Sequence, residues 1–225
     1  MPNRFTVAAL FGVATFIVTA WLGVVGPKQV AHPVAGDNRD PVIAMEMVRT
    51  PEQLTAVIGE SRQQYSELRD AIDKVNRIDF IFMTAYGAFI ASFFLAIAQA
   101  RNDRRWVLFS LLAVVAVMAD VRENMTLLQL TQDGADVSPL IGSLMVSTWI
   151  KWMALGLSAA GAGYAIYADQ RMPYLRMFGG IVGVAAFACT LGAYFDPLRL
   201  AQMMAIGIFL TWLIQAIYAY RLSRP

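Results

Sequence analysis

The sequence has little charge for its length. Only 15% of its 225 residues are Asp, Glu, Lys or Arg, against roughly 25% in an ordinary soluble domain. The shortage is concentrated in long uncharged runs, and 58% of the residues are hydrophobic. A water-soluble fold cannot bury several apolar runs of about 20 residues, the length that spans hydrocarbon. The composition therefore predicts an integral membrane protein.

Cysteine and histidine are almost absent. The single cysteine, Cys189, lies in an apolar run, so no intramolecular disulfide can form. The single histidine, His32, argues against a multi-histidine metal or haem site. We therefore expect no metal and no cofactor. The net charge of +2 gives no strong attraction for nucleic acid.

Motifs of the common nucleotide-dependent and hydrolytic enzymes are also missing. The chain has no Walker A loop, no GxGxxG after a strand, no GxSxG, no HExxH and no CxxC. Each of these motifs places a specific catalytic or phosphate-binding group. Their absence leaves open whether the protein is an enzyme.

Six apolar runs are long enough to cross a bilayer as helices. They are continuously apolar rather than alternating, which argues against membrane-spanning strands. Short links make neighbouring helices antiparallel, so we predict an all-α, six-span up-and-down bundle. The first run is too long for a signal-peptide core, and we expect it to be retained. The predicted spans are residues 5–25, 80–100, 106–130, 140–167, 174–195 and 200–220.

Residues 26–77, between the first two runs, contain Pro, Gly and charge. Residues 26–41 are predicted to form an extended loop. The Thr-Pro-Glu-Gln motif at residues 50–53 matches a capping box with proline at the first helical position, and residues 61–64 form a weaker one. Apolar residues then recur at three- or four-residue spacing over residues 65–78, which predicts an amphipathic helix. This helix either lies on the membrane surface or continues into the second span.

Arginine in the short links sets the expected orientation, because cytoplasmic loops are rich in basic residues. With six spans, the N-terminus, two basic links and the C-terminus all fall on one side. We therefore predict an inner (plasma) membrane protein with cytoplasmic termini and an extracytoplasmic segment at 26–77. The basic residues that carry this prediction are Arg4, Arg101, Arg104, Arg105, Arg171, Arg176, Arg221 and Arg224.

Small residues gather on the fourth and fifth runs. Gly156, Ala160 and Gly163 lie on the fourth run, and Gly179 and Gly183 form a GxxxG on the fifth. Small residues let helix backbones approach closely in lipid. We expect packing between these two spans, and the alternative is a protein partner or a homo-oligomer at the Gly179/Gly183 face.

The third run contains polar side chains where lipid is expected: Asp120, Arg122, Glu123 and Asn124. A charge at the centre of a membrane helix costs roughly 2.5–3.5 kcal/mol on insertion scales. Lys151 in the fourth run supplies the opposite charge. The link centres near Ala135, with Asp120 15 residues before it and Lys151 16 after it. An antiparallel hairpin therefore places Asp120 and Lys151 at similar depth.

Neighbouring residues extend this cluster. Glu123 and Asn124 lie on the same broad face as Asp120, whereas Arg122 points elsewhere. Asp79 and Tyr86 on the second span are placed to approach it from a third helix. Glu46, in a short apolar patch, either caps the cluster or faces water or a local salt bridge, and we favour the second option. The tryptophans are expected to be interface or packing residues.

Three stretches together resemble a group of bacterial multi-pass membrane proteins. They are residues 45–51 around Glu46, residues 78–86 with an "LDF-F…Y" pattern, and residues 119–124 with "D-x-x-E-N", followed by Lys151. Here Ile78 stands in the leucine position. The resemblance covers residues 42–155 and implies no activity. It draws attention to Glu46, Asp79, Tyr86, Asp120, Glu123, Asn124 and Lys151.

Three functions remain open. The leading one is a binding or accessory membrane protein whose polar site on spans two to four takes a membrane lipid or a small anionic ligand, held by Lys151. The ligand-contacting candidates are Lys151, Asn124, Asp79, Tyr86 and Glu46. The alternatives are a membrane enzyme acting on a lipid or isoprenoid, with Asp120 or Glu123 as acid or base, and a structural subunit of a larger complex. A cavity reaching Glu123 from the outer side would favour binding.

Overall fold

The computed structural model describes residues 4–34, 37 and 39–224, so residues 35, 36 and 38 of the expected loop lie outside the described part. The described residues form eight helices and no strand. The all-α prediction is confirmed. The helices are α1 (Thr6–Val25), α2 (Pro41–Glu46), α3 (Pro51–Ile58), α4 (Ser66–Arg101), α5 (Trp106–Leu130), α6 (Val137–Tyr167), α7 (Pro173–Phe195) and α8 (Pro197–Ser223).

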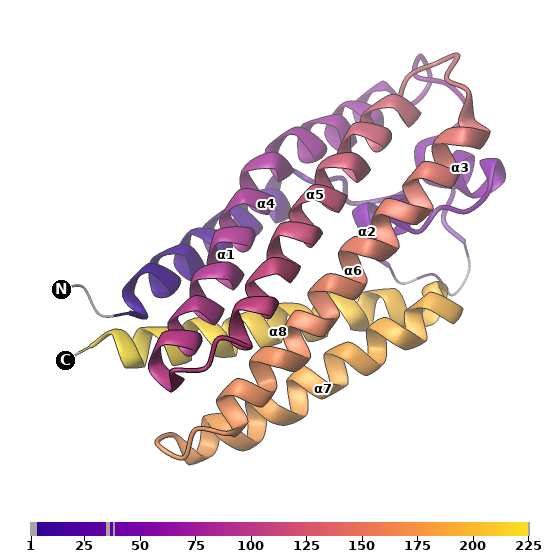
Figure 1. Cartoon of the computed structure of the whole chain (residues 1–225). Helices are drawn as coiled ribbons and strands as arrows, with labels where there is room; N and C mark the ends of the chain where they lie inside the picture. Colours follow the sequence, from indigo (N-terminus) through magenta and orange to yellow (C-terminus); the bar gives the residue numbers. More distant parts are fainter. Residues whose placement is uncertain (1–3, 35–36, 38, 225) are drawn as a thin grey trace.

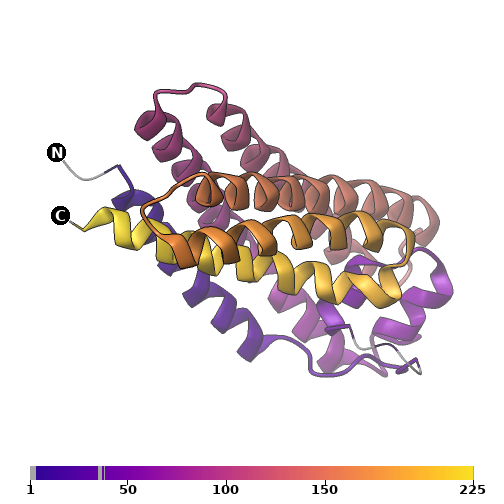
Figure 2. The same cartoon turned by 90° about the horizontal axis from the view of Figure 1, so that it is seen from below.

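Six long helices, α1 and α4 to α8, form one up-and-down bundle (Figure 1). Each of the helices α4 to α7 packs on the helix that follows it in the chain. The first helix, α1, packs on both α4 and α8. The two termini lie at one end of the bundle, and the short helices α2 and α3 lie at the other (Figures 1 and 2). The residues between α1 and α4 therefore form a cap at the end opposite the termini.

Five helices are long and apolar enough to cross a membrane, namely α1, α4, α6, α7 and α8. These helices support a membrane location. The helix α5 has 25 residues, but Asp120, Arg122 and Glu123 lie within it and lower its hydropathy. Length and composition therefore support five of the six predicted spans, while α5 lies between α4 and α6 in the same bundle.

The helix starts follow local capping chemistry. Thr50 caps α3, with its side chain accepting a hydrogen bond from the backbone N–H of Gln53 at 3.3 Å, and proline occupies the first helical position. The Thr50 half of the predicted capping box is therefore confirmed, whereas the Gln53 side chain accepts from the Arg49 backbone N–H at 2.8 Å rather than from Thr50. The weaker box makes its bond from the Gln64 backbone N–H to Ser61 at 3.3 Å, but the helix begins only at Ser66. From there α4 runs without a break to Arg101, so the amphipathic segment continues into the second span.

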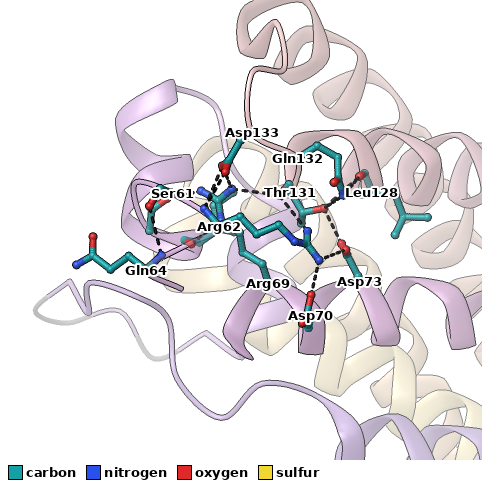
Figure 3. Close-up of polar contacts among 12 residues, drawn as sticks. Ser61, Arg62, Gln64, Arg69, Asp70, Asp73, Leu128, Thr131, Gln132 and Asp133 are labelled. Carbon is teal, nitrogen blue, oxygen red and sulfur yellow. Dashed lines mark hydrogen bonds and ion pairs between the residues drawn. The ribbon is translucent and has the colours of Figure 1, made fainter. Parts of the chain in front are cut away.

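The end cap is fastened to α4 and to the α5–α6 turn by buried arginine (Figure 3). Arg69 is 4% exposed and donates to the Asp133 carboxylate at 2.8 Å and to the Thr131 carbonyl at 3.1 Å. The same guanidinium donates to the Gly59 carbonyl at 2.8 Å, just after α3. Thr131 in turn donates to Asp73 on α4 at 2.5 Å. These bonds fix α3, α4 and the α5–α6 turn relative to one another.

Two turns at the opposite end share one arrangement. The Asp103 side chain accepts from the Arg105 backbone N–H at 3.0 Å, and Asp169 accepts from Arg171 in the same way. Arg171 holds the pKa of the Asp169 carboxyl well below its usual range through this hydrogen-bonded pairing. Asp169 also accepts from the Tyr218 hydroxyl at 2.5 Å. The α6–α7 turn is thereby tied to α8.

The glycines of α6 and α7 allow these two helices of the same chain to pack closely. A Cβ added at Gly183 would lie 2.6 Å from the Ala159 carbonyl and 2.9 Å from the Cα of Gly163, and one at Gly163 would lie 2.7 Å from the Gly179 carbonyl. The backbones of α6 and α7 therefore touch along this seam. The expected packing of the fourth and fifth spans is confirmed, while a protein partner or homo-oligomer at the Gly179/Gly183 face stays a prediction.

Gly183→Ala is expected to destabilise the bundle, because the added methyl meets backbone that cannot move aside. The cost should be about 1–3 kcal/mol, as for other overpacked cores. Gly142→Ala is the matched control, since it is also helical but has open space around it, and both changes gain the same helix propensity. Unfolding in detergent measures both variants, and equal stability would contradict the tight seam.

Candidate functional site

Lys151 is the centre of a buried ionic cluster. It lies midway along α6 with 4% of its surface exposed. Its ammonium nitrogen lies 3.0 Å from a Glu46 oxygen and 3.3 Å from Asp120 Oδ1, and it also pairs with Glu123. An ammonium group has three hydrogens to donate. Three carboxylates therefore lie within ion-pair distance of it, although Asp120 Oδ1 accepts no hydrogen bond from the described residues.

The α5–α6 hairpin positions two of these carboxylates. Its short turn makes the two helices antiparallel, and Asp120 lies level with Lys151 as the depth argument predicts. Glu123 is one turn along α5 on the same face and is fully buried. Arg122 points away from the cluster and donates to Ser143 at 3.2 Å, as expected.

The helix α4 closes the cluster from a third side. The Tyr86 hydroxyl donates to Asp120 Oδ2 at 2.7 Å. One level higher, the Asn124 amide donates to Asp79 at 2.7 Å and to the Asn76 carbonyl at 3.3 Å. The structure therefore brings Asp79, Tyr86 and Asn124 to the same cluster as Lys151, the arrangement that the sequence predicts.

Glu46 is the point at which the favoured prediction is wrong. Instead of facing water it is 8% exposed, and besides Lys151 it receives a hydrogen bond from the Trp152 indole at 2.9 Å. The helix that carries it begins with Asp40 accepting from the Val42 N–H at 2.9 Å and with Pro41 at the first position. This short helix turns the chain inward and puts its last residue against the middle of α6.

Two tryptophans belong to the site, although the sequence suggests only packing or interface roles for them. Trp152 donates its indole N–H to the Glu46 carboxylate. Its position directly after Lys151 is the sequence feature that could indicate this role. Trp212 on α8 stacks on Tyr86 with ring centroids 5.3 Å apart. The Trp212 indole N–H is buried and has no hydrogen-bond partner in the described part of the chain. No local pattern around Trp212 distinguishes it from a packing residue.

A cavity of about 450 Å³ leads to this cluster. Near the termini Phe5, just before α1, packs edge to face on Tyr218 of α8 at 5.9 Å, and at mid-length Phe16 of α1 packs on Phe209 of α8 at 5.2 Å. Beyond this point the two helices diverge toward the α2 end (Figures 1 and 2). The space between them is walled by α1, α4, α6 and α8 and bounded by α2. Most of the walls are apolar. The apolar lining includes Leu22, Val75, Phe82, Leu155, Ile208 and Phe209.

Polar residues of the cluster line the cavity floor, and Thr19, Lys28, Asp40 and Gln202 line the cavity from outside the cluster. The cluster residues at the floor include Glu46, Asp79, Tyr86, Asp120 and Lys151, whereas Glu123 is not among them. A cavity therefore reaches the predicted site but stops short of Glu123. Of the two acid–base candidates, only Asp120 is open to a ligand.

Negative charge exceeds positive charge at this site. Glu46, Asp120 and Glu123 share one lysine, and Asp79 is held by an amide rather than by a cation. The described residues contain no group of His, Cys, Asp or Glu arranged to hold a metal ion. Because Lys151 is already paired with three carboxylates, the geometry does not favour the predicted anionic ligand at Lys151.

Lys151→Met is expected to destabilise the protein by about 3–5 kcal/mol, because it leaves buried carboxylates without a cation. Adding Glu123→Gln should recover part of this loss, since it removes one of the stranded charges. Lys74→Met, on the exposed face of α4, is the control and should have little effect. Unfolding midpoints measured in detergent test this order of stabilities. Equal midpoints for Lys151→Met and Lys74→Met would contradict a stabilising role of the ionic cluster.

Comparison with known proteins adds no relative from which a role could be transferred. The chain matches no protein-family model, and no curated protein or solved structure is similar to it.

Proposed function

We propose that this is a six-span membrane protein that binds an amphipathic, lipid-like ligand in the cavity between α1, α4 and α8. The ligand's chain lies along the apolar walls and its polar end reaches the Lys151 cluster. The observation that carries the proposal is the cavity itself, which joins an apolar cleft to ionisable residues at its floor. Its volume lies within the roughly 300–1,000 Å³ of small-molecule sites.

The depth of the cluster supports a ligand that enters from the membrane. On α4, Lys74 and Arg77 are exposed and basic, and Ile81 is 52% exposed, which is the change expected at a membrane surface. Nine residues separate Arg77 from Tyr86, a rise of about 13 Å along a helix. The polar floor then lies near the middle of a hydrocarbon layer about 30 Å thick.

The helix α5 is the sixth span in this proposal. Its charged residues Asp120 and Glu123 face Lys151 rather than lipid, so they do not oppose insertion of the finished bundle. Most exposed side chains on its other face are apolar, including Leu108, Leu111 and Val114, and Arg122 is the charged residue among them. Such a helix fits lipid on one side and a polar site on the other.

The proposed orientation places the termini in the cytoplasm and the α2–α3 cap outside the inner membrane. The termini and the two basic links lie at one end of the bundle, in line with the positive-inside rule. Several basic residues at the other end are paired with acids. Arg39 pairs with Asp37 at 2.7 Å and Arg69 with Asp133 at 2.8 Å.

An enzyme acting on a lipid remains the second candidate. The supporting observation is that Asp120, a possible acid or base, lines the cavity while its neighbour Tyr86 donates to it. Glu123 takes no part in such a reaction, because it does not border the cavity. Turnover of a bound lipid that stops in Asp120→Asn would separate this candidate from simple binding.

Gly23→Phe is expected to lower the amount of lipid retained by the purified protein several-fold. Gly23 lines the cavity mouth and has open space beside it, so the new ring enters the cavity without disturbing packing. Gly142→Phe adds the same ring in open space away from the cavity and should retain lipid normally. Mass spectrometry of extracted lipid measures both variants. Equal retention by the two would contradict binding in this cavity.

Cysteine labelling tests the orientation. In a Cys189→Ala background, Asp136→Cys in the α5–α6 turn should react with a membrane-impermeant maleimide on intact spheroplasts. Arg104→Cys in the α4–α5 turn should react only after the membrane is permeabilised. The opposite pattern would reverse the orientation, and labelling of both sites from outside would contradict a membrane-spanning α5.

A further inference from the structure

The polar floor of the cavity carries more negative than positive charge. Lys151 is shared by Glu46, Asp120 and Glu123. Asp79 contacts no basic side chain in the described part of the chain, and its hydrogen-bond partner is the Asn124 amide. An unpaired carboxylate away from water is costly. A positive group brought by the ligand would lower this cost.

Three of these carboxylates border the cavity directly, those of Glu46, Asp79 and Asp120. Asp79 is the most accessible of them, because it is only partly buried whereas Glu46 and Asp120 are buried. Its carboxylate is therefore placed to meet a cation that enters between α1 and α8. A small anion would meet the same carboxylates and be repelled.

Aromatic rings surround the same space. Phe82, Tyr86, Trp152 and Trp212 all line the cavity, and Tyr86 and Trp212 are stacked with a 21° angle between their planes. Aromatic faces attract cations, and the attraction grows when water is excluded. Lys151 itself lies 5.0 Å from the Trp152 ring centroid. The walls are therefore suited to a positive group as well as to an alkyl chain.

Trp212 supplies an independent sign that a ligand belongs here. It is 5% exposed, it lines the cavity, and its indole N–H has no partner among the described residues. Buried polar groups in folded proteins are nearly always hydrogen-bonded. An indole N–H only donates, so the group that satisfies it is an acceptor such as an ether, ester or hydroxyl oxygen.

We propose that the ligand of this cavity is an amphipathic cation, with a protonated amine beside Asp79 and Asp120 and a hydrogen-bond-accepting oxygen near Trp212. This inference rests on the proposed lipid-like ligand and specifies its polar end. The alkyl chain lies toward the apolar mouth of the cavity between α1 and α8. The class includes lipids with an amine headgroup and simpler alkoxyalkylamines.

Three probes with the same alkyl chain and different head groups distinguish the effect of head-group charge on binding from the effect of the alkyl chain. They are an alkoxyethylamine, the matching alkoxyethanol and the matching alkoxyacetate, each carrying one bromine on the alkyl chain within a few carbons of the ether oxygen and each added to the protein in a neutral maltoside detergent. Bromine quenches indole fluorescence at short range, and Trp152 and Trp212 line the cavity. We expect saturable quenching by the amine, with a half-saturation concentration at least about tenfold below those of the alcohol and the carboxylate.

Variants of Asp79 test whether the preference for the amine depends on this carboxylate in the cavity. Asp79→Asn keeps the shape and removes the charge, so the amine should lose its advantage while the alcohol binds as before. Asp79→Glu keeps the charge and should keep the preference. Asp136→Asn, which removes an exposed carboxylate in the α5–α6 turn, is the matched control and should behave as the unchanged protein.

The possible results distinguish this inference from the function on which it rests. Equal binding of amine and alcohol would overturn the cationic class while leaving a lipid-binding cavity. Tightest binding of the carboxylate would also overturn it and would favour an anion at Lys151. Absence of saturable quenching by all three probes would overturn the proposed ligand cavity together with its charge preference.

Discussion

A single ammonium group in the middle of α6 holds three separate parts of the chain in place. Through Asp120 and Glu123 it joins α5 to α6, and through Glu46 it draws α2 into the bundle. Charges in a bilayer are tolerated when they meet a partner inside the protein. The ion pairs of Lys151 therefore allow α5, the one long helix in the described part of the chain without a stretch apolar enough to span a membrane, to share a bundle with the five that have one.

The same cluster determines where the cavity ends. Tyr86 reaches it from α4 and stacks on Trp212 of α8, so four helices meet at one level. Between that level and the termini the start of α1 contacts α8, where Phe5 packs on Tyr218. On the other side of that level Phe16 still contacts Phe209, and the two helices then separate toward the α2 end. A site formed in this way lies on rigid helices, with only α2 supplied by a short connecting segment.

Much of this arrangement follows from the sequence, because short links fix which residues lie level with one another. Asp120 and Lys151 are nearly equidistant from the α5–α6 turn, and that spacing was enough to predict their contact. Asp79 and Tyr86 follow from the same register one helix earlier. The Gly163 and Gly183 seam is predictable for a similar reason, since adjacent antiparallel helices bring small residues together.

Other parts depend on information that no local pattern contains. The burial of Glu46 is set by the path of the residues between α1 and α4, which have no helical period to fix their depth. Trp212 comes from α8, which is far from α4 in the sequence although it packs beside it. The cavity arises from a divergence of α1 and α8, and a divergence between helices leaves no pattern in the sequence of either one.

The order of the ionic residues along the chain has a consequence for synthesis. When α5 leaves the ribosome, Asp120 and Glu123 have no cation near them, because Lys151 follows 28 residues after Glu123. A helix with stranded charges partitions poorly into lipid on its own. In the proposed six-span topology, the α5–α6 hairpin is therefore the unit that must enter the bilayer together, and Glu46, which is synthesised earlier, can join Lys151 only afterwards.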